Sequence, residues 1–464
     1  MSRGTGLVAA LLFIALVLAG AIGSLGAPLI TAVAQDYGVS LAAAQWSLTI
    51  TLLTGAVATP LLGRLGSPRR RRTVVLATLA VMTAGSVATV VPGPFAVLLA
   101  GRAAQGVGLG LTPLLMATAR AHLGERAPGT IAMLSVASTA GVGVGYPVAG
   151  LLTEAGGPRS VYWLGVAVTA AALATAFIAL PRDDAGAPPD GPVDWPGAAL
   201  LSLGLVAVLL VTSQTGLWTG DPLVAVLVLA AGLAVLAGWV VVERRVPRPL
   251  VDLVALRHPS VAAANLVMGV SGVAMYLLFT LITRYVQTPP RAGYGYGLTA
   301  VEAGLVLVPF SVLGFAAGRV VPRLRRLGPF VLLAGCGAVL TVACALFAGT
   351  RSLGVAWPVV AMALLGVGVG GASAAMPAAI LAVTPGDETA AAMSVNQVVR
   401  SVGFSLGSAL GGLLLAAYTP AGAFAPEGTG YTAAAWTAAA LAVVAIALAL
   451  RVKVAQTSDA GERA

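Results

Sequence analysis

The feature that most constrains this chain of 464 residues is a series of long apolar runs with short connections. A helix needs roughly 20 apolar residues to cross the hydrocarbon core of a bilayer. These runs are too long and too evenly apolar for the strands of a membrane barrel. The sequence therefore predicts an all-α integral membrane protein with about 14 transmembrane helices. The predicted spans are 7–30, 42–62, 73–91, 95–116, 129–152, 160–180, 196–216, 222–242, 260–283, 300–318, 329–348, 355–376, 390–416 and 431–450.

The charge content agrees with a membrane protein. Only 9% of the residues are charged, against about 25% in ordinary soluble domains. The formal net charge of +10 suits anionic lipid headgroups better than nucleic acid, and we expect no nucleic-acid partner. Cys336 and Cys344 share one apolar run without metal-ligand spacing, which predicts small core residues. We expect neither a metal nor another cofactor.

The first apolar run has an alternative interpretation as a signal peptide, since Arg3 precedes it and small residues follow. A second apolar run starts within about a dozen residues, which favours a first span.

Basic residues indicate the orientation. With both termini placed in the cytoplasm, 20 of the 26 Lys and Arg residues fall in inner segments and four in outer segments. The run "GRLGSPRRRR" at 63–72 is then a cytoplasmic loop. In a soluble protein the same run would suggest nucleic-acid binding.

The chain also repeats itself. "GRLGSPRRRR" is echoed by "GRVVPRLRRLG" at 318–328, "QGVGLG" at 105–110 by "LGVGVG" at 365–370, and "TAGVGVGYPVAGLL" at 139–152 by "SVGFSLGSALGGLL" at 401–414. The offsets of 255, 260 and 262 residues predict two parallel six-helix halves with two helices inserted between them. The predicted divisions are an N-terminal half at 7–180, a linker with the inserted helices and a cytoplasmic loop at 181–258, and a C-terminal half at 260–450.

At this point the sequence resembles the major facilitator superfamily, in particular its fourteen-span drug:proton antiporter branch. The loop at 63–72 is similar to the family pattern G-x-L-x-D-R-x-G-R-R. Gly63, Leu65, Arg71 and Arg72 match, Arg64 lies within the same segment, and Ser67 stands where the family has an aspartate. In the family that carboxylate pairs with basic groups and a helix end, and it latches the outward-facing state. The alternative is that the arginines only set the topology.

The fourth span carries "GRAAQGVGLG", which resembles the family's R-x-x-Q-G pattern. An arginine at membrane depth should face a partner or an aqueous cavity, and Gln105 lies three residues beyond Arg102 on the same helix face. The alternative is that Arg102 extends to the outer interface.

The fifth span resembles the antiporter signature G-x-x-x-G-P-x-x-G-G. Gly141, Gly145, Pro147 and Gly150 keep its sense, and Ala149 replaces a glycine. Small residues permit close helix approach, and proline permits a kink. Ordinary small-residue packing is the alternative.

In the thirteenth span, Arg400 could bind substrate together with Asn396 and Gln397, or it could contact headgroups. Tyr276 is a further candidate for the wall of the substrate site.

The resemblance implies a secondary transporter that exports small amphipathic organic molecules by alternating access, in exchange for protons. The family's aspartate in the first span is absent, and Ala19 takes its aligned position. The nearest membrane carboxylates are Glu154 and Glu302, although Thr299 and Glu302 also fit a capping box that opens the tenth span.

Two other interpretations stay open: a facilitator or importer without proton coupling, and an intramembrane enzyme. An enzyme would need clustered acids, histidines or a metal, which the spans lack. The expected partners are a small-molecule substrate, the lipid bilayer and protons. We expect a multi-pass monomer in the cell membrane.

Overall fold

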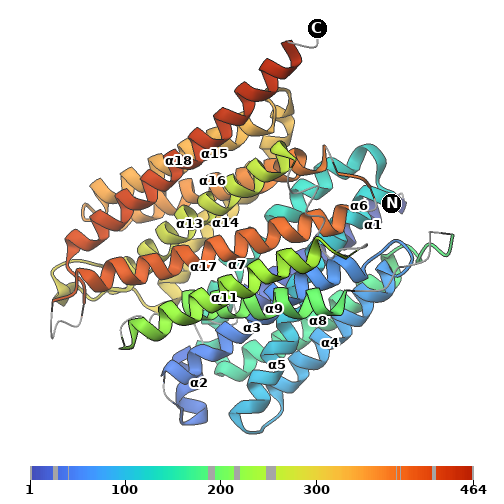
Figure 1. The fold of residues 1–464 in the computed structure, drawn as a ribbon. Helices are drawn as coiled ribbons and strands as arrows, with labels where there is room; N and C mark the ends of the chain where they lie inside the picture. Colours follow the sequence, from blue (N-terminus) through green and yellow to red (C-terminus); the bar gives the residue numbers. More distant parts are fainter. Residues whose placement is uncertain are drawn as a thin grey trace. The chain divides into compact units, whose positions relative to one another are not determined.

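The fold is built from helices. In the computed structural model, shown in Figure 1, the described residues are 3–23, 30–39, 41–186, 194–213, 220–246, 258–382, 384–386, 388–420 and 425–461. Every regular element in these ranges is helical. The helices of the first part of the chain are α1 (Arg3–Gly23), α2 (Ile30–Tyr37), α3 (Leu41–Leu65), α4 (Arg71–Val90), α5 (Phe95–Val107), α6 (Thr112–His122), α7 (Ala127–Gly156), α8 (Pro158–Ala179), α9 (Trp195–Ser213) and α11 (Pro222–Glu243). Those of the second part are α13 (Pro259–Gln287), α14 (Ala300–Val320), α15 (Pro329–Thr350), α16 (Ala356–Leu381), α17 (Thr389–Ala417) and α18 (Gly428–Gly461).

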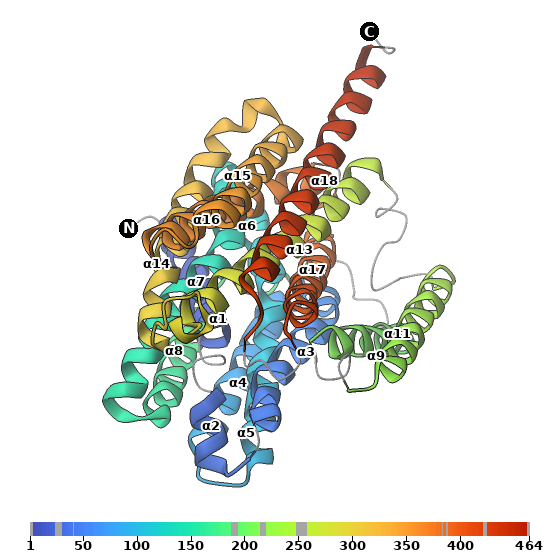
Figure 2. The same ribbon diagram turned by 90° about the vertical axis from the view of Figure 1, so that its left-hand side faces the viewer.

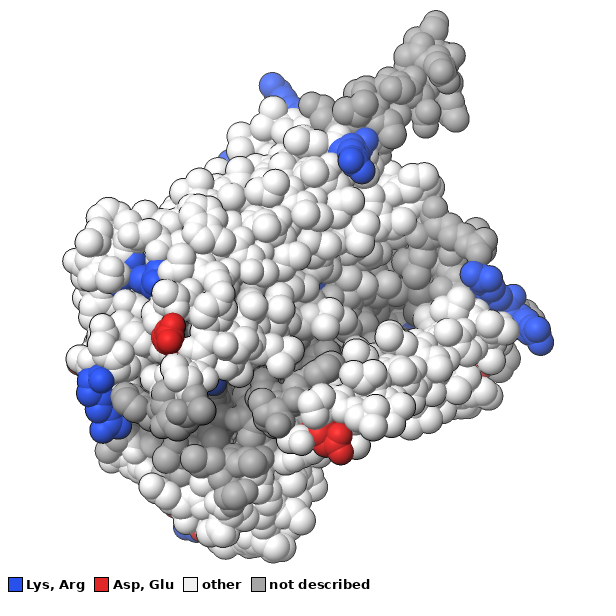
Figure 3. Space-filling view, turned by 60° about the vertical axis from the view of Figure 1, so that its left-hand side comes forward, with Lys and Arg blue, Asp and Glu red and all other residues white. Residues whose placement is uncertain are grey.

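The predicted membrane architecture is confirmed. Each of the fourteen predicted ranges overlaps a helix. Among the described residues, eleven helices are long and apolar enough to cross a membrane, and shorter apolar helices cover Gly4–Leu18 and Trp195–Val211. The number of fourteen crossings stays a prediction. On the face in Figure 3, the described surface is mostly uncharged. Large apolar side chains such as Phe177 and Ile178 are 65% and 83% exposed, as expected for residues that face lipid.

Two compact units divide the chain. The first unit comprises Met1–Leu210, Val226–Leu253 and Thr384–Val398. Within it α1 packs on α7, α5 packs on α3 and α4, and α4 packs on α8. Helices α9 and α11 run side by side in Figures 1 and 2, and a Cβ built on Gly204 of α9 would lie 2.6 Å from Leu236 of α11.

The second unit comprises Val211–Ala225, Val254–Val383 and Val399–Ala464. Within it α16 packs on α14 and α15, and α18 packs on α13 and α15. Cys336 and Cys344 of α15 are both reduced and buried, as their apolar surroundings predicted. Helix α17 belongs to both units, because they divide between Val398 and Val399.

Two local features differ from the expected spans. The described part of the first helix ends at Gly23, residues 24–29 lie outside the described residues, and the short helix α2 lies where a loop was expected. The fourth span is interrupted by a 3-10 turn, Gly108–Leu111. Gly108 and Gly110 are weak helix formers, and Pro113 follows them.

The internal repeat is visible in the helix packing. Glycines of α5 meet the backbone of α3, and their counterparts 260 residues later in α16 meet the backbone of α14. A Cβ on Gly106 would lie 2.2 Å from the Thr51 carbonyl oxygen, and one on Gly366 would lie 2.2 Å from the Phe310 oxygen. The second pair continues this contact: a Cβ on Gly110, in the 3-10 turn after α5, would lie 3.0 Å from Thr59 Cα, and one on Gly370 would lie 2.1 Å from the Gly314 oxygen. The weak sequence repeat therefore corresponds to one shared mode of helix contact.

The segment between α13 and α14 folds back onto an aromatic cluster. Gly295 has φ of +85°, and a Cβ there would lie 2.2 Å from the Thr288 carbonyl oxygen, so the turn requires glycine. Tyr294 stacks on Tyr285 with ring centroids 5.5 Å apart, and its hydroxyl donates to the Pro426 oxygen at 2.5 Å. Burial, followed by the proximity of Tyr431, raises the pKa of Tyr294, so this phenol is neutral at physiological pH.

Candidate functional site

The most deeply buried charged side chain described in the first unit is Arg102 of α5, which is 1% exposed. Its Nε donates to the Ser47 carbonyl oxygen of α3 at 3.1 Å, and its Nη1 donates to Gln105 Oε1 at 2.8 Å. The guanidinium is thus held inside the unit, which contradicts the alternative that Arg102 extends to the interface. The pairing of Arg102 with Gln105 follows from their spacing on one helix face.

Gln105 extends this arrangement to two further helices. Its Nε2 donates to Ser86 Oγ of α4 at 3.0 Å, and Thr169 Oγ1 of α8 donates to the same oxygen at 3.3 Å. Ser86 and Thr169 are fully buried. We call Arg102, Gln105, Ser86 and Thr169 the buried polar network; its last two members were not predicted.

The buried polar network retains one donor without a partner. Arg102 Nη2 is buried and has no hydrogen-bond partner among the described residues. An unmet N–H group on a buried cation is costly, so a water molecule, an ion or a ligand is expected to accept from it. The buried polar network can therefore bind a further hydrogen-bond acceptor through Arg102 Nη2.

A second group of predicted site residues lies on α17. Asn396 and Gln397 are consecutive residues of this helix, and Arg400 lies one turn further on, at i+4 and i+3 from them. Asn396 and Arg400 are 5% and 7% exposed. The Arg400 guanidinium carbon lies 5.9 Å from the centre of the Phe404 ring, a cation–π distance.

Aromatic side chains adjoin Arg400 within the second unit. Tyr276 of α13 stacks on Phe404 of α17 with ring centroids 5.3 Å apart, and on Phe279 at 5.6 Å. Phe310 of α14 meets Phe279 edge-on at 5.6 Å. The sequence analysis named only Tyr276 among these rings. Phe279 follows Tyr276 by three residues and Phe404 follows Arg400 by four, and these spacings place each pair on one helix face. This surface can bind flat apolar rings.

Of the two carboxylates proposed for proton transfer, the structure describes the side chain of Glu302. Glu302 is exposed at the start of α14, where it completes the predicted capping box: Thr299 N donates to Glu302 Oε2 at 2.8 Å, and Glu302 N donates to Thr299 Oγ1 at 3.3 Å. The Glu154 side chain lies outside the described residues.

Two buried acids escaped the sequence analysis. Asp194 and Glu243, at the adjoining ends of α9 and α11, are 9% and 2% exposed. Both approach Gly197, whose built Cβ would lie 2.0 Å from Asp194 Oδ2 and 2.8 Å from Glu243 Oε2. Each lies at the boundary of an apolar run, where a carboxylate is normally solvated, so its position in the sequence gives no sign of burial.

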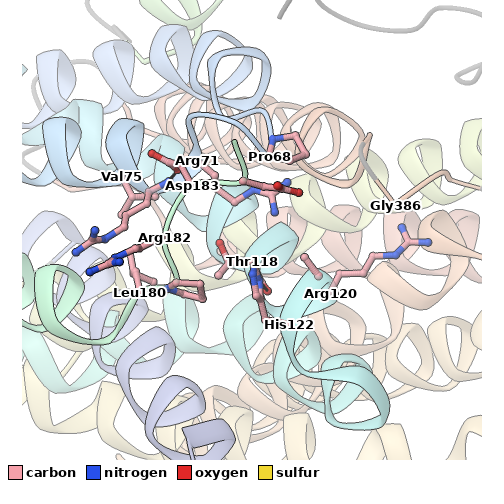
Figure 4. A pocket seen from close by; sticks show the side chains of 14 residues that line it. Pro68, Arg71, Val75, Thr118, Arg120, His122, Leu180, Arg182, Asp183 and Gly386 are labelled. Carbon is pink, nitrogen blue, oxygen red and sulfur yellow. Dashed lines mark hydrogen bonds between the residues drawn. The ribbon is translucent and has the colours of Figure 1, made fainter. Parts of the chain in front are cut away.

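Residues of the arginine-rich loop line a pocket of about 470 Å³, shown in Figure 4. Arg71 and Arg72 line this pocket, and Arg71 is 7% exposed. Arg64 closes the last turn of α3, and Gly63 contacts α17, since its built Cβ would lie 2.3 Å from Ser394 Oγ.

The antiporter-like segment lies in the middle of α7, which packs on α1. Gly141, Pro147 and Gly150 are buried, Gly145 is half-buried, and Pro147 is inside the helix. Pro147 removes one backbone donor there, as expected. In the related segment of α17, Gly403 meets α13 closely, with its built Cβ 2.6 Å from the Gly269 oxygen.

Comparison with known proteins decides the family. The model described as Major Facilitator Superfamily matches residues 12–408. The chain belongs to the major facilitator superfamily. This superfamily consists of transporters, and so the chain is a membrane transporter.

Members of the major facilitator superfamily with related sequences include resistance proteins. The chain is 31% identical over 396 residues to the puromycin resistance protein of Streptomyces alboniger, and the match covers 82% of this chain and 75% of that protein. It is 26% identical over 393 residues to a multidrug resistance protein B homolog of Mycobacterium tuberculosis, covering 82% and 70%. The crystal structure of the human organic anion transporter MFSD10 has a TM-score of 0.68 and 14% identity, and the alignment covers 97% of this chain and 100% of that one; it shows the shared fold.

Ser67 is a departure from the loop pattern of this superfamily. Where this superfamily's loop pattern has a carboxylate, the Ser67 Oγ is buried and has no hydrogen-bond partner among the described residues. The basic residues of the pattern are present around it.

Proposed function

We propose that this transporter exports small amphipathic organic molecules of the antibiotic or drug class across the cell membrane, by alternating access. The observation that carries the proposal is the buried polar network, whose Arg102 Nη2 is available to an acceptor inside a membrane unit. The names of the relatives, puromycin resistance and multidrug resistance, support the substrate class. The ring surface of Tyr276 and Phe404 suits flat apolar substrates.

The proposed working unit is a monomer in which the N-terminal half at 7–180 and the C-terminal half at 260–450 move about the substrate. Residues 181–258 join the halves through the inserted helices. Arg102, Gln105, Asn396, Gln397 and Arg400 contact substrate or the coupling ion, and Gly63 with the glycines and Pro147 of α7 serves the conformational change.

Deletion of the gene in the producing organism tests the direction of transport. An exporter leaves its substrate inside the deletion strain, whereas an importer leaves it in the medium. Comparison of retained and secreted metabolites measures this difference, and an unchanged distribution would contradict the proposal.

Proton exchange is the second part of the proposal. Proteoliposomes with an acidic interior should concentrate puromycin, because proton efflux drives substrate entry in an antiporter. Labelled puromycin in the vesicles measures this uptake, and nigericin should abolish it. Protein-free liposomes with the same gradient give the passive trapping of a weak base, which is subtracted.

The carboxylate that carries the proton is tested in the same vesicles. We expect Glu154→Gln or Glu302→Gln to lower gradient-driven accumulation, and Glu243→Gln tests the buried acid of α11 in parallel. Equilibration without any response to the gradient would favour the alternative, a facilitator without proton coupling.

The proposed topology places both termini in the cytoplasm. Single cysteines at Ser67 and Ser260 should then react with impermeant thiol reagents only after the membrane is permeabilised, whereas those at Thr288 and Thr350 should react in intact cells. Cys336 and Cys344 are replaced by alanine beforehand. Thr288 that reacts only after permeabilisation would contradict the fourteen-span topology.

A further inference from the structure

The start of α4 is capped by a residue from a distant segment. Its N-cap residue, Arg70, makes no side-chain capping bond. Instead Asp183, which follows α8, accepts from Arg72 N at 2.6 Å through Oδ1 and from Thr73 N at 3.2 Å through Oδ2. Thr73 Oγ1 also donates to Asp183 Oδ2 at 2.5 Å. A carboxylate at this position meets two free N–H groups and the positive end of the helix dipole.

The segment around Asp183 and the arginine-rich loop are joined in both directions. Asp184 N donates to the Pro68 oxygen at 3.1 Å, and Arg72 Nη2 donates to the Phe177 oxygen of α8 at 2.7 Å. The Arg72 guanidinium carbon also lies 5.5 Å from the centre of the Phe177 ring. The position of the loop therefore depends on the segment after α8.

The loop in turn contacts α6. Arg71 donates from Nε to the Gly66 oxygen at 3.3 Å and from Nη1 to the Ala117 oxygen at 3.4 Å. One turn further along α6, Arg120 extends toward Gly386 in Figure 4, and its Nη1 donates to Thr389 Oγ1 at 2.8 Å. Arg120 Nη2 donates to the Thr384 oxygen at 2.8 Å.

These contacts form one continuous series, which we call the clasp: Asp183, the loop at 66–73, Arg71, Arg120 and the start of α17. Gly63 and Ser394 make a direct contact between α3 and α17 beside it. Ser394 is 1% exposed. The clasp thus holds the start of a helix that continues into the second unit.

We propose that Asp183 is a positioning residue of the transport cycle, which supplies from the segment after α8 the carboxylate that the loop itself lacks at Ser67. Ser67 Oγ has no hydrogen-bond partner among the described residues, while Asp183 accepts the N–H groups of the adjoining helix start. Asp183 acts through the loop and Arg71 on α6 and the start of α17. The proposal rests on the proposed transport function.

The main variant is Asp183→Asn in a chain without Cys336 and Cys344 and with Ser394→Cys as a reporter. The amide turns an N–H donor toward donors of α4, so the cap weakens and the clasp opens more often. Loss of one of the two accepting oxygens, together with the negative charge at the helix start, corresponds to about a five- to tenfold change in an opening equilibrium. We expect the cysteine at 394 to react with a cytoplasmic thiol reagent about five- to tenfold faster, and puromycin transport to fall by a similar factor.

Asp184→Asn is the matched control. It removes the same charge one residue away, from an exposed carboxylate whose described contact is the Gly186 N–H group at 2.9 Å. We expect labelling and transport within about twofold of the parent, because the Asp184 side chain does not cap α4.

The double variant Ser67→Asp with Asp183→Asn decides between a positioning role and a cap needed only for folding. Restored labelling and transport at unchanged thermal stability support the proposal, because a carboxylate in the loop then replaces Asp183. It is overturned if Asp183→Asn changes neither labelling nor transport. It is also overturned if that variant only lowers thermal stability and Ser67→Asp restores nothing. Labelling does not depend on the substrate, so a parent that moves no puromycin but shows the labelling pattern contradicts the proposed function and leaves the clasp standing.

Discussion

Arg102→Ala is expected to lower transport of the proposed drug-like substrates, with puromycin as the probe, by at least about tenfold while the protein still reaches the membrane. The substitution removes the Nη2 donor and leaves Gln105 Oε1 and the Ser47 oxygen without their charged partner. Arg102→Lys should restore little, because one ammonium cannot reproduce the planar fork that serves both acceptors. Uptake by proteoliposomes, normalised to the inserted protein, measures the effect.

Arg284→Ala is the matched control for this prediction. Arg284 is an exposed arginine of α13, and its loss removes the same charge without touching the buried polar network. Its transport should stay within about twofold of the parent. Normal transport by Arg102→Ala would show that the network only supports the fold.

Gly370→Ala is expected to have the largest effect on stability. The new Cβ would lie 2.1 Å from the Gly314 carbonyl oxygen and 2.6 Å from its Cα, and no side chain can move aside to relieve this contact. Helices α14 and α16 must therefore separate. Overpacking of this kind costs about 3 kcal/mol or more. The loss appears as a lower apparent melting temperature of the detergent-solubilised protein in size-exclusion measurements.

Gly335→Ala provides the comparison. Gly335 is also inside an apolar helix, but its built Cβ meets no atom within 4 Å. Alanine is the better helix former by about 1 kcal/mol, so this variant should be as stable as the parent or more stable. Equal melting temperatures for the two variants would contradict the proposed backbone contact.

The helices were predictable because membrane depth imposes a length and a composition on each run. The same reasoning could not find α2, which is too short to show a span, or the 3-10 turn at Gly108–Leu111, which an apolar run conceals. Residue spacing predicted hydrogen-bonded pairs correctly where both partners lie within one helical turn. Thr299 with Glu302 and Arg102 with Gln105 are such pairs, and both are hydrogen-bonded.

Contacts between distant segments were not predictable from one sequence. Asp183 caps α4 from 110 residues away, and the linker around it is polar and resembles any exposed connection. Ser86 and Thr169 each bond to a carbonyl oxygen of their own helix, as serine and threonine in a span usually do, so the sequence does not mark their additional contacts with neighbouring helices. Asp194 and Glu243 are buried through the pairing of two helices that the sequence treats separately.

The contact of glycines with carbonyl oxygens in α3–α5 and α14–α16 determines where the molecule can deform. Where two helices touch through backbone atoms, no side chain lies between them that could change rotamer to accommodate a displacement. We therefore expect α3 with α5, and α14 with α16, each to move as one rigid pair. Thermal fluctuations should concentrate in interfaces lined by longer side chains, because those side chains can exchange rotamers. In relatives with alanine or serine at these glycines, the two helices of each pair would lie further apart. Different groups of helices would then move together in their conformational cycles.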